Sequence, residues 1–129
     1  MATMRRLVEQ ALTSMGYTDL TFGSDGTEAW DHLRLAHDAR SPYQLLISDW
    51  MMPTMTGLEL LRKVRADERF KELPVLLLTS ESEMGHMLEA IKAGVNHYVT
   101  KPFTAEVLKT KMDQVWSNLQ KKAASKPAS

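Results

Sequence analysis

The sequence predicts a single α/β domain built on a doubly wound parallel sheet with helices on both faces. Apolar runs of strand length alternate with helical patterns of about ten to fifteen residues, which indicates βαβ units. The runs are apolar at nearly every position, as in strands covered on both faces. The 129 residues suffice for one core that buries roughly two thirds of the unfolded chain's surface. Residues 121–129 are small, basic and Pro-containing, so we place the domain at residues 1–120 and expect a flexible tail.

Charge and residue content limit the class of function. The 16 Lys and Arg residues balance the 16 Asp and Glu residues, and the basic residues are interleaved with acids, which does not favour a nucleic-acid partner. The absence of cysteine removes disulfides, thiolate catalysis and Cys-ligated metals. No apolar run approaches the roughly 18 residues of a membrane span, and the N-terminus lacks the apolar stretch of a signal peptide. We therefore expect a cytoplasmic protein without a membrane partner.

The first third of the chain predicts a helix, a short strand and a second helix. Apolar residues at helical spacing precede Gly16, a residue suited to a left-handed helix end. Leu20–Phe22 is a strand candidate, and Asp25 with Glu28 three residues later predicts a helix start. The Ser41-Pro42 pair ends that helix. The apolar faces of the two helices are Met4, Leu7, Val8, Ala11, Leu12 and Met15, then Ala29, Trp30, Leu33 and Ala36.

The middle of the chain predicts two buried strands and the helix between them. Tyr43–Asp49 is a nearly continuous apolar run that ends in an acid. Thr56 and Glu59 form a capping box, which predicts that a helix begins there. Val75–Thr79 is the second apolar run and follows a proline. The helix between the runs carries Leu58, Leu61 and Val64 near one face.

The last third predicts a helix, a strand and a long final helix. Ser80 and Glu83 form another capping box, and Gly94 closes the helix that follows. Asn96–Thr100 is the last predicted strand, and Thr104 caps the final helix. The apolar residues of the two helices are Met84, Met87, Leu88 and Ile91, then Leu108, Met112, Val115 and Leu119.

Three polar side chains lie at the carboxyl ends of the predicted strands, where chemistry is found in open α/β sheets. They are Asp49, Thr79 and Lys101. Taken singly, the acid could open a turn, the hydroxyl could cap a helix and the ammonium could be solvated. Together, a carboxylate, a hydroxyl and a cation at one edge suit phosphoryl transfer. The carboxylate can act as a nucleophile, and the other two groups can bind phosphoryl oxygens.

The segments around these residues resemble the receiver domain of bacterial two-component response regulators, most closely the single-domain chemotaxis (CheY-like) type. The similarity covers residues 1 to about 120 and consists of three motifs in the family's order. It implies a flavodoxin-like fold and a signalling module rather than an enzyme. The motifs are Ser48-Asp49-Trp50 through Leu61, Leu73-Pro74 through Thr79-Ser80, and Gly94 through Tyr98-Val99-Thr100-Lys101-Pro102-Phe103-Thr104.

The resemblance also implies a role for each site residue. Asp49 would accept a phosphoryl group from a histidine kinase, and Thr79 and Lys101 would contact the phosphoryl oxygens. Asp49 and the main-chain carbonyl of Met51 would hold Mg²⁺, and Lys101-Pro102 would be a cis peptide.

Tyr98 would be an aromatic switch that turns inward when the Thr79 side chain moves toward the phosphate. Without the family, a half-buried strand aromatic would explain this residue equally well. A flagellar-motor or phosphatase partner would bind the face formed by Ile91-Lys92, Tyr98 and Val107–Lys111.

The chain departs from this family at its start. The family opens with a buried central strand that ends in two acids, which hold Mg²⁺ together with the phosphoacceptor. Here the first helix matches the family's first helix, so the acidic pair would fall immediately before Met1. We interpret the chain either as a shortened form of an ordinary phosphoacceptor or as a natural pseudo-receiver that binds partners or dimerises without phosphate.

This departure leads to two expectations. Asp49 and one carbonyl are a poor Mg²⁺ site, so phosphorylation should be slow or absent. The missing strand would remove five or so buried side chains, together worth about 10 kcal/mol. An ordered chain should therefore pair its open strand edge with another chain, as in a rearranged, domain-swapped or strand-bridged homodimer.

Two other function classes fit the sequence less well. A flavin-binding flavodoxin-like protein needs a hydroxyl-rich phosphate loop after the first strand, which the sequence lacks. A hydrolase needs a Ser-His-Asp set or a nucleophile elbow, and neither is present. The four histidines, His32, His37, His86 and His97, are scattered at expected surface positions.

Overall fold

From residue 26 onward helices and strands alternate along the chain, as the sequence predicts. The computed structural model describes residues 2–17, 20–23, 25–50, 55–80 and 85–125. Within these ranges no helix has both the length and the apolar character that crossing a membrane requires. The helices are α1 (Ala2–Ser14), α2 (Gly26–Asp38), α3 (Gly57–Ala66), α4 (Met87–Ala93) and α5 (Ala105–Ser125), and the strands are β1 (Leu46–Asp49), β2 (Val75–Thr79) and β3 (His97–Thr100).

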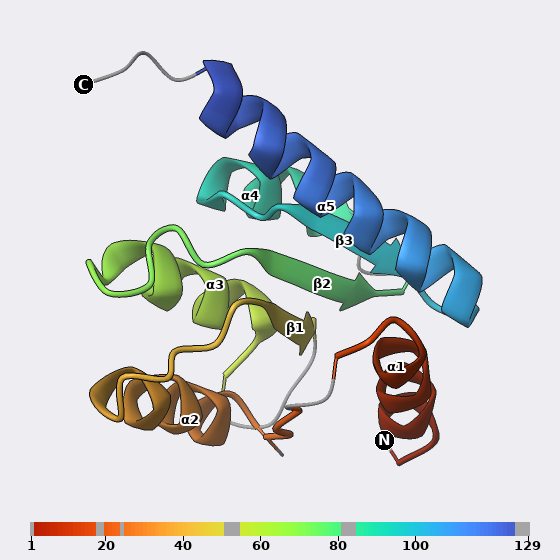
Figure 1. Ribbon diagram of the computed structural model, residues 1–129, viewed down its shortest axis with the longest axis horizontal. Coiled ribbons are helices and arrows are strands. Elements are labelled where there is room, and N and C mark those ends of the chain that lie inside the picture. Colours follow the sequence, from red (N-terminus) through yellow and green to blue (C-terminus); the bar gives the residue numbers. More distant parts are fainter. Residues whose placement is uncertain (1, 18–19, 24, 51–54, 81–84, 126–129) are drawn as a thin grey trace.

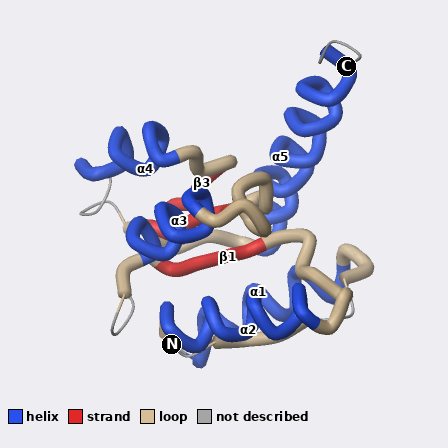
Figure 2. The backbone as a smooth tube through the Cα atoms, turned by 90° about the vertical axis from the view of Figure 1, so that its left-hand side faces the viewer, coloured by secondary structure: helices blue, strands red, loops and turns tan. Residues whose placement is uncertain are grey.

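The strands form a parallel sheet in the order β1-β2-β3, and their arrows run side by side in the same direction in Figure 1. Asp49 lies opposite Leu78, and Thr79 lies opposite Thr100. The carboxyl ends of the three strands therefore meet at one edge of the sheet. Figures 1 and 2 both place α1 and α2 beyond the outer edge of β1.

Two layers of helices enclose the sheet. All five residues of β2 are buried, and they alternate between two apolar clusters. Val75 and Leu77 pack with residues of α2, α3 and α4, whereas Leu76 and Leu78 pack with residues of α1 and α5. A strand covered on both faces explains why the run is apolar at every position before Thr79. The predicted doubly wound α/β architecture is thus confirmed.

Local end signals act where the sequence places them. Thr56 and Glu59 form the predicted capping box of α3, with a Glu59 N to Thr56 Oγ1 distance of 3.1 Å and a Thr56 N to Glu59 Oε1 distance of 3.0 Å. Backbone and side-chain hydrogen bonds with Thr56 lower the pKa of Glu59. The Asp25 carboxylate accepts a hydrogen bond from Glu28 N at the start of α2. Gly16 and Gly94 adopt φ values of 96° and 95°, the left-handed conformation expected after a helix.

The predicted strand at Leu20–Phe22 is absent, and these residues have no regular secondary structure. A strand persists only when a neighbouring strand takes up its backbone hydrogen bonds. In the described part of the chain, no backbone hydrogen bond joins residues 20–22 to β1. The link is a side-chain contact instead, since the Tyr43 hydroxyl donates to Thr21 Oγ1 at 2.6 Å. β1 is also shorter than the predicted strand Tyr43–Asp49. Its backbone pairing with β2 begins only at Leu46, whose N–H donates to Pro74 O.

The ends of α4 and α5 also differ from expectation. Glu83 and Met84, which the sequence assigns to the start of the fourth helix, lie outside the described residues. α4 follows His86, whose side chain makes no cap hydrogen bond. α5 continues to Ser125, so the first five residues of the expected tail are helical. Lys and Ala are good helix formers, and they extend a helix that tertiary packing has already nucleated.

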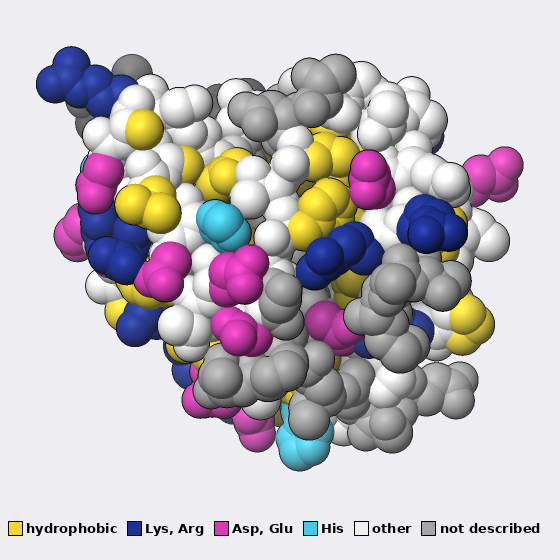
Figure 3. Space-filling view, turned by 90° about the horizontal axis from the view of Figure 1, so that it is seen from below, with side chains coloured by type: hydrophobic (Ala, Val, Ile, Leu, Met, Phe, Trp, Pro, Cys, Tyr) yellow, Lys and Arg dark blue, Asp and Glu magenta, His cyan; other side chains and the backbone are white. Residues whose placement is uncertain are grey.

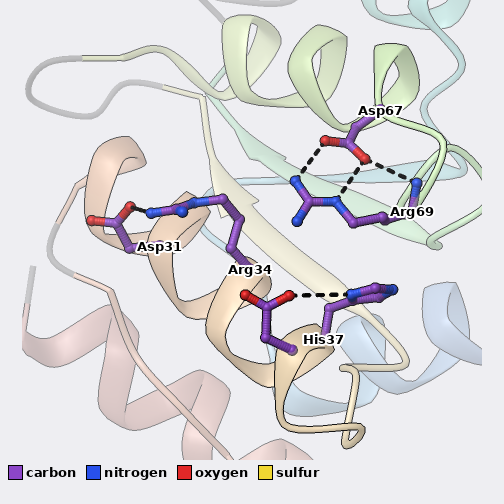
Figure 4. A network of polar contacts seen from close by, with 6 residues as sticks. Asp31, Arg34, His37, Asp67 and Arg69 are labelled. Atoms are coloured by element: carbon purple, nitrogen blue, oxygen red, sulfur yellow. Dashed lines mark hydrogen bonds and ion pairs between the residues drawn. The ribbon is translucent and has the colours of Figure 1, made fainter.

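Polar pairs on α2 lie near the Asp67–Arg69 pair in the turn after α3 (Figure 4). Arg69 donates to both carboxylate oxygens of Asp67, at 2.9 and 3.0 Å. These bonds lower the pKa of Asp67 to about 2. The buried Phe70 ring meets the rings of Trp30 and His37 edge to face, and the Arg69 guanidinium carbon lies 5.0 Å from its centre. Phe70 therefore packs the turn after α3 against α2.

Candidate functional site

Asp49 and Lys101 meet at the carboxyl end of the sheet. The Lys101 Nζ donates to Asp49 Oδ1 at 2.5 Å, although 52 residues separate them in sequence. Both side chains are about three quarters buried, with 23% of the Lys101 side chain and 26% of the Asp49 side chain exposed. A partly buried, charge-assisted contact of this kind holds each group in one geometry. The sequence-based prediction that these two residues converge is confirmed.

Thr79 lies between them in the sheet and is fully buried. Its carbonyl accepts a hydrogen bond of 2.6 Å from Lys101 N, so the backbone of Lys101 is fixed to the end of β2. Its hydroxyl donates to Ser80 O at 3.3 Å. The peptide bond between Lys101 and Pro102 is cis, as the resemblance implies. Asp49, Thr79 and Lys101 thus lie at the ends of three adjacent strands or directly after them.

Gly57 is a site residue that sequence reasoning did not identify. Its N–H donates to Trp50 O at 2.7 Å, which brings the first turn of α3 against the end of β1. A Cβ atom at this position would lie 2.4 Å from Asp49 O and 3.1 Å from Trp50 Cα. Only glycine permits this approach, which fixes the backbone that carries Asp49. A glycine at the first helical position, where it is not favoured, was the available signal.

His86 makes a ring contact that the sequence did not predict. The sequence suggested a solvated surface histidine, and its side chain is exposed. Its ring nevertheless stacks on the indole of the buried Trp50, with 6.4 Å between ring centroids and 25° between planes. Trp50 directly follows Asp49, so this contact connects the start of α4 with the end of β1.

The described residues do not by themselves form a Mg²⁺ site. Met51, the expected carbonyl ligand, lies outside them. Asp49 contributes one carboxylate, and Lys101 already occupies one of its oxygens. Across the described ranges, no group of three or more His, Cys, Asp or Glu side chains could hold a metal ion. Hard divalent cations usually need more anionic oxygens than Asp49 alone supplies.

Tyr98 lies on the edge strand β3 and is half buried. The Nζ of Lys111, on α5, is 5.5 Å from the centre of the Tyr98 ring. The flanking helices expose large apolar side chains, with 57% of Ile91 and 42% of Val107 accessible. These residues make up the face that the sequence analysis assigns to a protein partner. We call this surface, formed by Ile91-Lys92, Tyr98 and Val107–Lys111, the Tyr98 face.

The sequence is similar to those of known proteins. The chain is 46% identical to chemotaxis protein CheY1 of Helicobacter pylori over 114 residues, which is 88% of this chain and 89% of the relative. It is also 46% identical to chemotaxis protein CheY of Pseudomonas aeruginosa over 118 residues, or 92% of this chain and 91% of the relative.

Solved structures agree with the sequence relatives. Vibrio cholerae CheY4 superposes with a TM-score of 0.73 at 34% identity and covers 88% of this chain and 89% of its own. The receiver domain of a Pseudomonas aeruginosa sensor histidine kinase, with a magnesium ion coordinated in its active-site cleft, gives a TM-score of 0.70 at 28% identity and covers 89% and 90%. Residues 1–113 match the family described as the response regulator receiver domain. The chain therefore belongs to the response regulator receiver domain family and is similar to CheY regulators of the chemotaxis type.

Proposed function

We propose that Asp49 is the phosphoacceptor of this chain and that a histidine kinase is the donor. The observation that supports this most directly is the Lys101–Asp49 contact beside the buried Thr79, at the carboxyl end of the parallel sheet. A phosphoryl group on Asp49 would lie next to one cation and one hydroxyl. The chain would act as a signalling module, in the cytoplasm with its kinase, rather than as an enzyme that turns over a substrate.

The proposed transfer breaks the P–N bond of a kinase phosphohistidine and forms a P–O bond to the Asp49 carboxylate. The kinase imidazole leaves with the electron pair of the broken bond and takes up a proton. Lys101 moves its Nζ from the carboxylate to a phosphoryl oxygen, where negative charge accumulates in the transition state. Thr79 turns its hydroxyl from Ser80 O to another phosphoryl oxygen.

We further propose that Mg²⁺ binds weakly and that phosphorylation of this 129-residue polypeptide is slow. Asp49 and the main-chain carbonyl of Met51 are the ligands that the chain would contribute. The ion pair with Lys101 competes for the same carboxylate oxygen. Coordination of a magnesium ion in the active-site cleft of the Pseudomonas aeruginosa receiver domain supports the proposal that this fold binds Mg²⁺.

Transfer of radiolabelled phosphate from a phosphorylated chemotaxis kinase tests the acceptor. We expect labelling that is slower than that of Pseudomonas aeruginosa CheY and that Asp49→Asn abolishes. Hydroxylamine should release the label, because an acyl phosphate is sensitive to this nucleophile. Undiminished labelling of Asp49→Asn would exclude Asp49 as the acceptor. A rate equal to that of the relative, with tight Mg²⁺ binding by calorimetry, would refute the impairment.

The output surface in this proposal is the Tyr98 face. Thr79 and Tyr98 lie on neighbouring strands, since Leu77 is the register partner of Tyr98. A shift of the Thr79 side chain toward a phosphoryl group would leave room for the Tyr98 ring to turn inward. The exposed Ile91 and Val107 would then contact a flagellar-motor or phosphatase protein. Loss of binding in Ile91→Ser, with unchanged Asp49 labelling, is the expected result.

A second proposal is that the chain forms a homodimer through the outer edge of β1. β2 pairs with only one edge of this strand, and unpaired strand edges associate readily. Seen from below, the face onto which this edge opens has apolar side chains gathered near its middle (Figure 3). Leu45, directly before β1, and Ile47, within it, are only partly buried. Such a dimer would support the alternative function, a pseudo-receiver that acts by association without phosphate. A stable, folded monomer in analytical ultracentrifugation would exclude it.

A further inference from the structure

A hollow of about 450 Å³ lies between α3 and α4 and has no part in the proposed phosphoryl transfer. Charged side chains and two alanines line it, and the small alanine side chains leave room for a side chain of another molecule. The lining residues are Arg62, Arg65, Ala66, Glu89, Lys92 and Ala93.

The charge of this hollow is unbalanced. It contains three cations and one carboxylate, which leaves two positive charges without a partner in the lining. Arg62 Nη2 and Glu89 Oε2 are 3.9 Å apart, and more than half of each side chain is exposed. Such a contact is weak, because water screens it and both side chains remain free to move. Arg62 and Lys92 can therefore turn toward an incoming anion at little cost.

Arg65 strengthens this preference because its guanidinium is bound only by neutral groups. It donates to Gly94 O at 2.9 and 3.0 Å, to Leu73 O at 2.6 Å and to Asn96 Oδ1 at 2.8 Å. No ion pair joins it to a carboxylate within the described part of the chain. Burial lowers the pKa of Arg65, as expected for a cation that has lost water without gaining a counter-ion. A carboxylate entering the hollow would supply the missing charge.

An exposed apolar side chain, Leu88, lies beside the hollow. Leu88 lies one turn before Lys92 on α4, so the two side chains share a face of the helix. Leu88 is 61% exposed, which is unusual for a large apolar side chain beside a charged cavity. A small inorganic anion would gain no binding energy from contact with Leu88. A polypeptide with an acid next to an apolar residue would use both features.

We propose that the hollow between α3 and α4 is a docking site for an acidic segment of a partner protein, with its carboxylates held by Arg62 and Lys92 and an apolar neighbour packed on Leu88. The positive charge of Arg65 adds to the electrostatic attraction of the partner's carboxylates, and Arg65 keeps its own hydrogen bonds. The site does not depend on phosphorylation of Asp49. Lys92 also belongs to the Tyr98 face, but Arg62 does not, so Arg62→Gln separates a failure of this site from a failure of the proposed function.

A peptide titration tests the proposal. The probe is a dye-labelled, end-capped peptide in which Glu and Leu residues are spaced by Ser, followed by fluorescence anisotropy at about 50 mM salt. We expect saturable binding to the unphosphorylated protein, and chemical-shift changes at the amides of Ala66 and Ala93. Arg62→Gln and Lys92→Gln should each weaken binding by about fivefold.

Lys63→Gln is the matched control. It removes the same charge from the neighbouring residue of α3, but the Lys63 ammonium lies 4.9 Å from the Trp30 ring, toward α2. Its affinity should equal that of the wild type. Equal losses of peptide affinity in Lys63→Gln and Arg62→Gln would mean that only non-specific electrostatic attraction is measured, and would overturn the proposal. So would a lack of saturable binding, equal binding of a peptide with Gln in place of Glu, or displacement by an equal concentration of inorganic pyrophosphate.

Discussion

The close approach of α3 to the end of β1 makes Gly57→Ala the most informative single substitution. A new methyl group would lie 2.4 Å from Asp49 O, 3.1 Å from Trp50 Cα and 3.1 Å from Leu77 Cδ2. Two of these atoms belong to the backbone and cannot turn away. Overpacking of a fixed site costs up to about 3 kcal/mol, while alanine in place of glycine in a helix returns about 1 kcal/mol. We therefore expect a net loss of about 2 kcal/mol in the free energy of unfolding.

Urea unfolding measures this loss. With a slope of about 2 kcal/mol per molar urea for a small domain, the midpoint should fall by about 1 M without a change in slope. Gly85→Ala is the control, because a Cβ at that position meets no atom within 4 Å, and its midpoint should stay within about 0.5 kcal/mol of the wild type. If Gly57→Ala were as stable as the wild type, the proposed contact between α3 and the Asp49 backbone would not constrain the folded state.

Three further predictions concern contacts away from this approach. Thr56→Ala removes the hydroxyl that accepts from Glu59 N in the α3 capping box and should lower the free energy of unfolding by about 1 kcal/mol in urea. Arg65→Lys keeps the charge but loses the guanidinium contacts with Gly94 O, Leu73 O and Asn96, and it should cost about 2 kcal/mol in the same assay. The folded-state pKa of Asp67 is about 2 against an ordinary value of 3.8, so its contribution is present above pH 3.8 and disappears as the pH falls through 2. Asp67→Asn should therefore lower the melting temperature near neutral pH, and the difference from the wild type should vanish in acid.

The helices were the most predictable part of the fold, since their signals are local. Thr56 with Glu59, Asp25 and Gly94 mark helix ends by chemistry that acts within a few residues. The strand at Leu20–Phe22 was predicted from its apolar content, but a strand depends on a neighbour that the sequence segment itself does not contain. The sequence also did not show which apolar residues of α4 face the core. Leu88 and Ile91 are exposed, because this seven-residue helix turns Met87 and Ala90 toward the core instead.

The candidate site was predictable to the extent that it follows from topology. Parallel strands bring their carboxyl ends together, so Asp49, Thr79 and Lys101 converge although they are far apart in sequence. Gly57 and His86 depend on the distance between α3 and β1 and on the path of the chain into α4. Neither quantity is encoded in spacing or composition. Their roles emerge only when the backbone is placed in three dimensions.

The contact between the first and last helices has a consequence for synthesis of the protein. Trp116 Nε1 donates to Tyr17 OH at 2.7 Å across a separation of 99 residues, and Val8, Ala11 and Leu12 pack in the same cluster as Leu108 and Met112. At a translation rate of about 5–20 residues per second, α5 is synthesised roughly 5–20 s after the apolar face of α1 that it contacts. During that interval α1 lacks the α5 side chains that cover it in the finished domain. Folding yield in the cell should thus depend on the speed of the ribosome as well as on the stability of the finished domain.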